Sequence, residues 1–207
     1  MNRQAAALSL VLVLASLGLV AAQQVRQPLA PGTTAPDFTA TTLEGATIKL
    51  ADWRGKVVVL SFLITWFRDA ARHIEMMEHL GTAFSEQGMR LVSISLDEEH
   101  RGLDDLRALV REHAIAHPVV ADPRQQIAAL YGVSALPAIF VIGRDGKIAH
   151  YHEGYTEGDD ERLGAVIAAA LAAGAEGEAP AQAQESPPAA APEAEEPVCR
   201  CFRSDDQ

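Results

Sequence analysis

The sequence predicts an α/β fold, in which a mixed β-sheet carries helices on both faces and follows an N-terminal β-hairpin. Two short, β-branched apolar runs are each followed by a segment of helical periodicity, which is typical of parallel strands joined by crossover helices. Two more strand-like segments then follow one another across an Asp-Gly turn, before a last helix. Parallel strands combined with an antiparallel pair make the sheet mixed.

The first expected elements are the hairpin and a buried strand. Residues 38–42 and 46–50 flank Glu44-Gly45, which predicts two short antiparallel strands. Residues 56–64 form a continuous apolar run after Gly55. The short length and β-branched content of this run favour a central strand that is buried on both faces.

A helix and a second strand are expected next. Asp69 is placed to cap a helix that runs to Gln87 and ends at Gly88. The apolar stripe of this helix consists of Ile74, Met77, Leu80 and Phe84. Residues 89–96 then form a second strand, and we interpret the acidic segment Asp97-Glu98-Glu99-His100 after it as a solvated turn.

The last third of the periodic region supplies the antiparallel part of the sheet. Its expected elements are helices over 103–113 and 125–131, strands over 138–142 and 147–151 around Asp145-Gly146, and a closing helix over 159–173. Together the periodic segments predict one domain over 35–173, preceded by a polar leader over 23–34.

Charge limits the class of partner. The chain has 207 residues and a net charge of −11, from 28 acidic and 17 basic side chains. Its Lys and Arg residues do not cluster, so the sequence offers no basic face for phosphate contacts. We therefore expect no nucleic-acid partner.

Residues 1–22 have the pattern of a secretory signal peptide. Arg3 precedes an apolar stretch from Leu8 to Val20, and Ala22 is a small residue before a cleavage point at Gln23. The alternative is an uncleaved anchor, because the apolar stretch is marginal against the ~20 residues that span a bilayer. The domain is then periplasmic or secreted after cleavage, and contacts a membrane only if the segment is uncleaved.

Residues 174–207 form an acidic segment rich in Ala, Pro and Glu, which we expect to be a disordered tail. This segment holds the only two cysteines of the chain, Cys199 and Cys201. Three interpretations fit the pair: a strained disulfide that acts as a displaced redox pair, two thiolates for Cu(I), or an exposed tail pair that forms adventitious or intermolecular disulfides. We favour the last, because a C-x-C match alone is weak evidence.

Three segments carry a resemblance to a known family. They are the strand that ends in Thr65-Trp66, the stretch Val119–Asp122 that leads to Tyr131-Gly132-Val133, and the run Leu136-Pro137 to Lys147-Ile148. Over residues 35–173 the chain resembles thioredoxin-like proteins of the TlpA/ResA type, within the alkyl hydroperoxide reductase/thiol-specific antioxidant superfamily. The resemblance implies a thioredoxin-like fold, a thiol–disulfide oxidoreductase or antioxidant class, and a cis bond before Pro137 that faces the active site.

The departures from that family concern its reactive site. In the family the tryptophan is followed by Cys-x-x-Cys at a helix start, whereas here Phe67 and Ala70 occupy both cysteine positions. No thiolate can form there, so the usual dithiol mechanism cannot run. We interpret the chain as a degenerate member with no catalytic residue at the family site, which binds a protein partner in the thioredoxin-type groove through Trp66, Phe67 and Pro137.

A copper-handling protein is a third hypothesis. His73 and Met77 are neighbours on the first long helix, and His150 and His152 lie on one face of a strand. Imidazole and thioether ligands suit copper. We favour the simpler interpretation, in which Met77 packs in the core, the histidines are solvated, and the chain uses no cofactor. The sequence shows no zinc spacing, Ser/His/Asp set or phosphate-binding loop.

Overall fold

The computed structural model describes residues 27–98 and 101–173. The predicted signal segment 1–22 and the predicted tail 174–207, with Cys199 and Cys201, lie outside the described residues and stay predictions. Among the helices that are described, none has the length and apolar character needed to cross a membrane.

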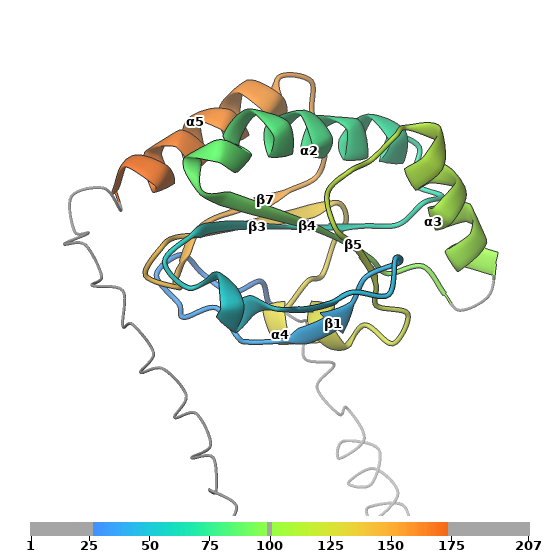
Figure 1. The fold of residues 1–207 in the computed structure, drawn as a ribbon, viewed down its shortest axis with the longest axis horizontal. Helices are drawn as coiled ribbons and strands as arrows, with labels where there is room; N and C mark the ends of the chain where they lie inside the picture. Colours follow the sequence, from blue (N-terminus) through green and yellow to red (C-terminus); the bar gives the residue numbers. More distant parts are fainter. Residues whose placement is uncertain (1–26, 99–100, 174–207) are drawn as a thin grey trace, which may run out of the picture. The chain divides into compact units, whose positions relative to one another are not determined.

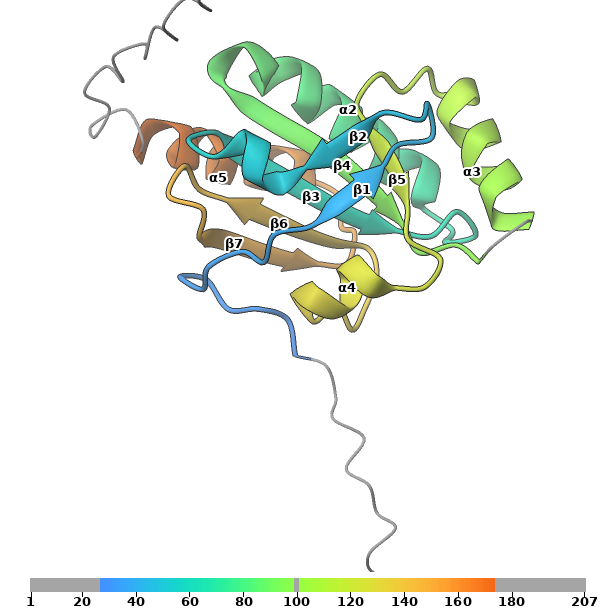
Figure 2. The same ribbon diagram turned by 60° about the horizontal axis from the view of Figure 1, so that its bottom comes forward.

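A five-stranded mixed sheet runs through the domain in the order β5-β4-β3-β6-β7 (Figures 1 and 2). The strands are β3 (Val57–Leu63), β4 (Met89–Ser95), β5 (Val119–Ala121), β6 (Ala138–Ile142) and β7 (Ile148–Glu153). Strand β4 is parallel to both β3 and β5, while β6 is antiparallel to both β3 and β7. The mixed sheet predicted from the sequence is therefore confirmed.

Helices and a hairpin cover the two faces of this sheet. The helices α2 (Ala70–Phe84) and α5 (Asp159–Ala173) lie on one face, and α2 ends in the short 3-10 helix η2 (Ser85–Gln87). The opposite face carries the strand pair β1 (Thr39–Thr41) and β2 (Thr47–Lys49), the 3-10 helix η1 (Leu50–Trp53) and helix α4 (Gln126–Tyr131). Helix α3 (Arg101–Glu112) lies at the β5 edge of the sheet (Figure 1).

Two apolar cores result, because alternate side chains of a strand point to opposite faces. All seven residues of β3 are buried, with Val57 and Val59 packed toward α2 and α5, and Leu60 and Phe62 toward α4. In the second core the Tyr131 ring lies 6.0 Å from the Phe62 ring, centroid to centroid. The Tyr131 hydroxyl donates a hydrogen bond of 2.8 Å to the Pro36 carbonyl, so this buried tyrosine also fixes the chain entering the domain.

Part of the predicted leader is attached to the domain. The Leu29 amide donates to the Tyr131 carbonyl at 3.1 Å, and the Gly32 amide donates to the Ile148 carbonyl at 2.7 Å. Gly132 has a φ of 68°, and a Cβ atom at this position would lie 2.0 Å from the Gln27 carbonyl oxygen. Only glycine combines this backbone conformation with so close an approach of the leader.

Most expected elements are confirmed, and two local predictions are wrong. Helix α2 begins after Asp69, but the Asp69 side chain makes no capping hydrogen bond; it lies 3.7 Å from the Arg72 guanidinium instead. Strand β5 was not expected from the sequence. Its three residues are too few for a clear period, and they are extended because they pair with Ser93–Ser95 of β4.

Candidate functional site

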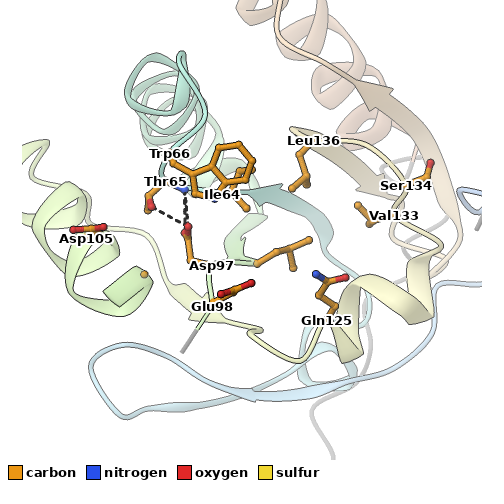
Figure 3. Close-up of a pocket in the computed structure, with 12 residues that line it drawn as sticks. Ile64, Thr65, Trp66, Asp97, Glu98, Asp105, Gln125, Val133, Ser134 and Leu136 are labelled. Carbon is orange, nitrogen blue, oxygen red and sulfur yellow. Dashed lines mark hydrogen bonds between the residues drawn. The ribbon is translucent and has the colours of Figure 1, made fainter. Parts of the chain in front are cut away.

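A cavity of about 660 Å³ opens where the parallel strands β3 and β4 end (Figure 3). Most of its walls come from four places in the sequence: residues 64–66 after β3, residues 96–98 after β4, Gln125 before α4, and Val133, Ser134 and Leu136 before β6. Gly102 and Asp105 of α3 complete the lining. Ligands of open α/β sheets commonly bind at the carboxyl ends of the strands, so this cavity is the candidate site.

Asp97 fixes the shape of the cavity floor. Its carboxylate accepts hydrogen bonds from the Thr65 amide at 3.0 and 3.1 Å and from the Thr65 hydroxyl at 2.9 Å (Figure 3). The Ser95 hydroxyl donates a further bond of 2.6 Å. Asp97 is only 3% exposed, so its prediction as part of a solvated turn is wrong. The carboxylate ties the end of β4 to the segment that carries Trp66.

An Asp97→Ala variant is expected to lose about 2 kcal/mol of unfolding free energy, because the half-buried Thr65 and the buried Ser95 lose their charged acceptor. Asp97→Asn keeps the shape and one acceptor oxygen, so its loss is expected to be smaller. Urea unfolding of both variants measures the difference. A loss below about 0.5 kcal/mol for Asp97→Ala would show that the carboxylate does not hold the floor together.

The segment before α2 forms one rim of the cavity through Ile64, Thr65 and Trp66. Trp66 is 79% exposed, Phe67 is half-buried, and Ala70, the first residue of α2, is buried. Leu136 lines the wall beside Trp66, whereas Pro137 is buried behind it. The Leu136–Pro137 bond is cis, as the family resemblance implied. Of the predicted binding residues, Trp66 is therefore the most accessible to a partner.

Comparison with known proteins identifies the family. The family model of AhpC/TSA proteins matches residues 31–151, which is more than half of the chain. The chain belongs to the AhpC/TSA family. The matched segment of this AhpC/TSA protein contains both rims of the cavity, from the residues before α2 to the cis bond before β6.

Two similar proteins are named for thiol–disulfide exchange. The thiol-disulfide oxidoreductase ResA of Geobacillus thermodenitrificans is 32% identical over 142 residues, which cover 67% of this chain and 80% of that protein. A crystal structure of a putative thiol:disulfide interchange protein DsbE from Chlorobium tepidum is 31% identical, with a TM-score of 0.64, and the match covers 69% of this chain and 99% of that one. The AhpC/TSA chain thus has a thioredoxin-like fold of the thiol-disulfide oxidoreductase class.

A third match supports the same fold. The solution structure of a putative protein disulfide isomerase from Bacteroides thetaiotaomicron is 27% identical, with a TM-score of 0.64. The match covers 72% of this chain and 94% of that one. The TlpA/ResA-type resemblance seen in the sequence is confirmed.

Behind the start of α2, the AhpC/TSA chain buries a serine–histidine pair. Ser61 of β3 and His73 of α2 are both fully buried, and Ser61 Oγ lies 2.7 Å from His73 Nε2. His73 Nδ1 has no hydrogen-bond partner among the described residues. Burial, with the neighbouring His152, lowers the pKa of His73 to about 4. The prediction that the histidines are solvated is therefore wrong for His73, which is a neutral core residue at pH 7.

A second buried serine–histidine contact joins three elements. The Ser93 hydroxyl lies 2.8 Å from His117 Nε2, and His117 Nδ1 lies 2.6 Å from Glu78 Oε2. Burial raises the pKa of Glu78, but hydrogen bonds from His117 and Ala116 outweigh it and bring the pKa below its usual value. This Ser–His–Glu chain has no accessible nucleophile, because Ser93 is fully buried. Its role is to fasten the segment before β5 to α2.

Among the four candidate copper ligands, Met77 and His73 are core residues. Met77 is fully buried in the core between the sheet and α5, as the simpler interpretation predicted. His73 contacts Ser61, and His152 Nε2 lies 3.1 Å from Asp159 Oδ2. Within the described ranges, no group of three or more His, Cys, Asp or Glu side chains is arranged to hold a metal ion.

Sequence reasoning missed the polar groups that line or support the site. Asp97 and its donor Thr65 are 32 residues apart, and Ser93 and His117 are 24 apart. The one available signal was the serine content of two otherwise apolar strands, at Ser61, Ser93 and Ser95. A polar side chain inside a buried strand needs a hydrogen-bond partner, and here each serine has one.

Proposed function

We propose that this AhpC/TSA chain binds a polypeptide partner at the cavity beside Trp66 and does not exchange thiols there. The observation that carries the proposal is the pair of residues at the start of α2, where Phe67 and Ala70 provide no sulfur. A thiol–disulfide oxidoreductase needs a low-pKa thiolate and a second thiol to resolve the mixed disulfide. The fold of an oxidoreductase is thus retained without its reacting group.

The state of the surrounding site supports a binding role. The cavity is open, Trp66 is exposed beside it, and Asp97 holds its floor through four hydrogen bonds. Relatives named thiol-disulfide oxidoreductase and disulfide isomerase support a polypeptide rather than a small molecule as the partner. We further propose that residues 1–22 direct the protein out of the cytoplasm, where such partners would meet it.

The full chain is expected to reduce a small disulfide substrate poorly at neutral pH. Its only thiols are Cys199 and Cys201, and a cysteine near its free pKa of ~8.5 is only a few per cent thiolate at pH 7. The test compares the full chain, a chain ending at Ala173, and a Cys199→Ser/Cys201→Ser variant. Both changes are expected to abolish the residual rate.

The outcomes of this assay separate the candidate functions. A substantial rate that both changes abolish would favour a redox enzyme acting through the Cys199/Cys201 pair. A rate that survives both changes would mean that chemistry at the cavity has been misread. Thermal unfolding of all three proteins controls for loss of the fold.

A further inference from the structure

The cavity beside Trp66 combines an apolar wall with exposed carboxylates. Ile64, Val133 and Leu136 supply apolar surface, and the exposed Trp66 stands at the rim (Figure 3). Glu98 and Asp105 are exposed carboxylates in the lining. No Lys, Arg or His is found among the described residues that line the cavity.

The acidic side chains of the lining differ in whether their carboxylates already have hydrogen-bond partners. Asp97 is committed to Thr65 and Ser95, so its carboxylate is already satisfied and fixed. Glu98 and Asp105 form no ion pair within the described part of the chain. Two exposed carboxylates at the mouth of a cavity give it a negative potential, which the net charge of −11 reinforces.

Resting on the binding function proposed above, we infer that the partner enters as an extended segment with a Lys or Arg side chain between apolar residues. The apolar side chains would pack on Ile64, Val133 and Leu136. The cation would lie against the Trp66 indole, with Glu98 and Asp105 as its counter-ions. A cation over an indole face is favourable, and both carboxylates are accessible to it.

Charge complementarity decides against the other kinds of segment. An acidic segment would meet Glu98 and Asp105 as like charges, without any described basic side chain in the lining to offset them. A wholly apolar segment would use the wall but leave both carboxylates without a counter-ion. A segment with a cation between apolar residues packs on the apolar wall and also pairs with the carboxylates.

Intrinsic fluorescence of Trp66 provides a direct assay. The second tryptophan, Trp53, is half-buried and lines a different cavity, so a full-length Trp53→Phe chain reports on Trp66 alone. Short acetylated peptides with a central Leu-Lys-Leu, Leu-Gln-Leu or Leu-Glu-Leu are titrated into it. The lysine peptide is expected to bind tightest and the glutamate peptide weakest, with differences that shrink as salt is added.

The acidic side chains are then tested in the same background. Glu98→Gln and Asp105→Asn are each expected to weaken the lysine peptide about two- to fivefold and to leave the glutamine peptide nearly unchanged. A Glu86→Gln chain loses the same single charge at an exposed position outside the cavity and serves as the control. Asp97 is left intact, because it is part of the floor.

The readouts keep this inference separate from the proposed function. Equal binding of lysine and glutamine peptides, or equal losses in the control chain, would overturn the cationic partner while leaving a binding groove. A response of Trp66 to none of the peptides would overturn the groove itself, and with it the proposed function.

Discussion

A Phe67→Cys/Ala70→Cys variant is expected to reduce a small disulfide substrate about tenfold or more faster than the unmodified chain at pH ~7. A cysteine of a Cys-x-x-Cys pair at a helix start can have a pKa near 7, so about half of it is thiolate at this pH. The residual rate of the natural chain depends on thiols that are only a few per cent ionised. Position 67 is half-buried and directly follows the exposed Trp66, which lines the cavity.

The controls for this gain of activity are matched substitutions at the same positions. All chains carry Cys199→Ser/Cys201→Ser, so that any thiol exchange comes from the new pair. A Phe67→Ser/Ala70→Ser chain has similar side-chain sizes and is expected to be inactive. If the dithiol chain folds, titrates two free thiols and is still no faster than the serine control, the loss of cysteines is not the reason for the missing activity.

The free energy of unfolding is expected to fall by about 3 kcal/mol between pH ~7 and pH ~4 because of His73 alone. In the unfolded chain the His73 imidazole binds a proton with a pKa near 6.5, whereas in the folded protein its pKa is lowered to about 4 by burial and by His152. Between these values the unfolded state holds more protons, so acid favours unfolding. The stabilising contribution is complete above pH ~6.5 and is lost as the pH falls to ~4.

The groups around His73 oppose one another in this titration. His152 and His117 lower the pKa of His73, Asp159 raises it, and the Tyr155 ring stands edge-on at 6.4 Å. His117 also has a pKa lowered by burial, so it contributes acid sensitivity of the same sign. The total pH dependence therefore exceeds that of His73, and only a comparison of variants isolates the His73 share.

Urea unfolding of a His73→Gln variant over this pH range measures that share. The variant can still hydrogen-bond to Ser61 but has no titrating imidazole, so its pH dependence is expected to be flatter by about 3 kcal/mol. The exposed His79 of the same helix provides the control, because His79→Gln makes the same substitution at the protein surface. Parallel curves for His73→Gln and the natural protein would show that His73 is protonated as easily in the folded state as in the unfolded one.

Local patterns in the sequence were sufficient for most of the fold. The expected ends of the closing helix, residues 159–173, agree with those of α5. The run 56–64 contains β3 at Val57–Leu63, and Gly88 has a φ of 94° where α2 was expected to stop. These elements were predictable because periodicity, β-branching and glycine act on neighbouring residues.

The sequence also determined what the site lacks. Neither Phe67 nor Ala70 carries sulfur, whatever the packing around them, and the proposal of a binding role rests on these two residue types. The family resemblance supplied the alignment of those positions, which lie within the segment 31–151 that matches AhpC/TSA proteins, and their assignment stays a prediction.

Tertiary structure alone decided the environment of the polar side chains. The acidic Asp97 is buried because Thr65, at the end of another strand, brings its amide and hydroxyl to it. His73 is neutral because the sheet surface at Ser61 covers it. The sequence gives the type of a titratable side chain. Its burial and its hydrogen-bond partners depend on residues that only the folded chain brings close.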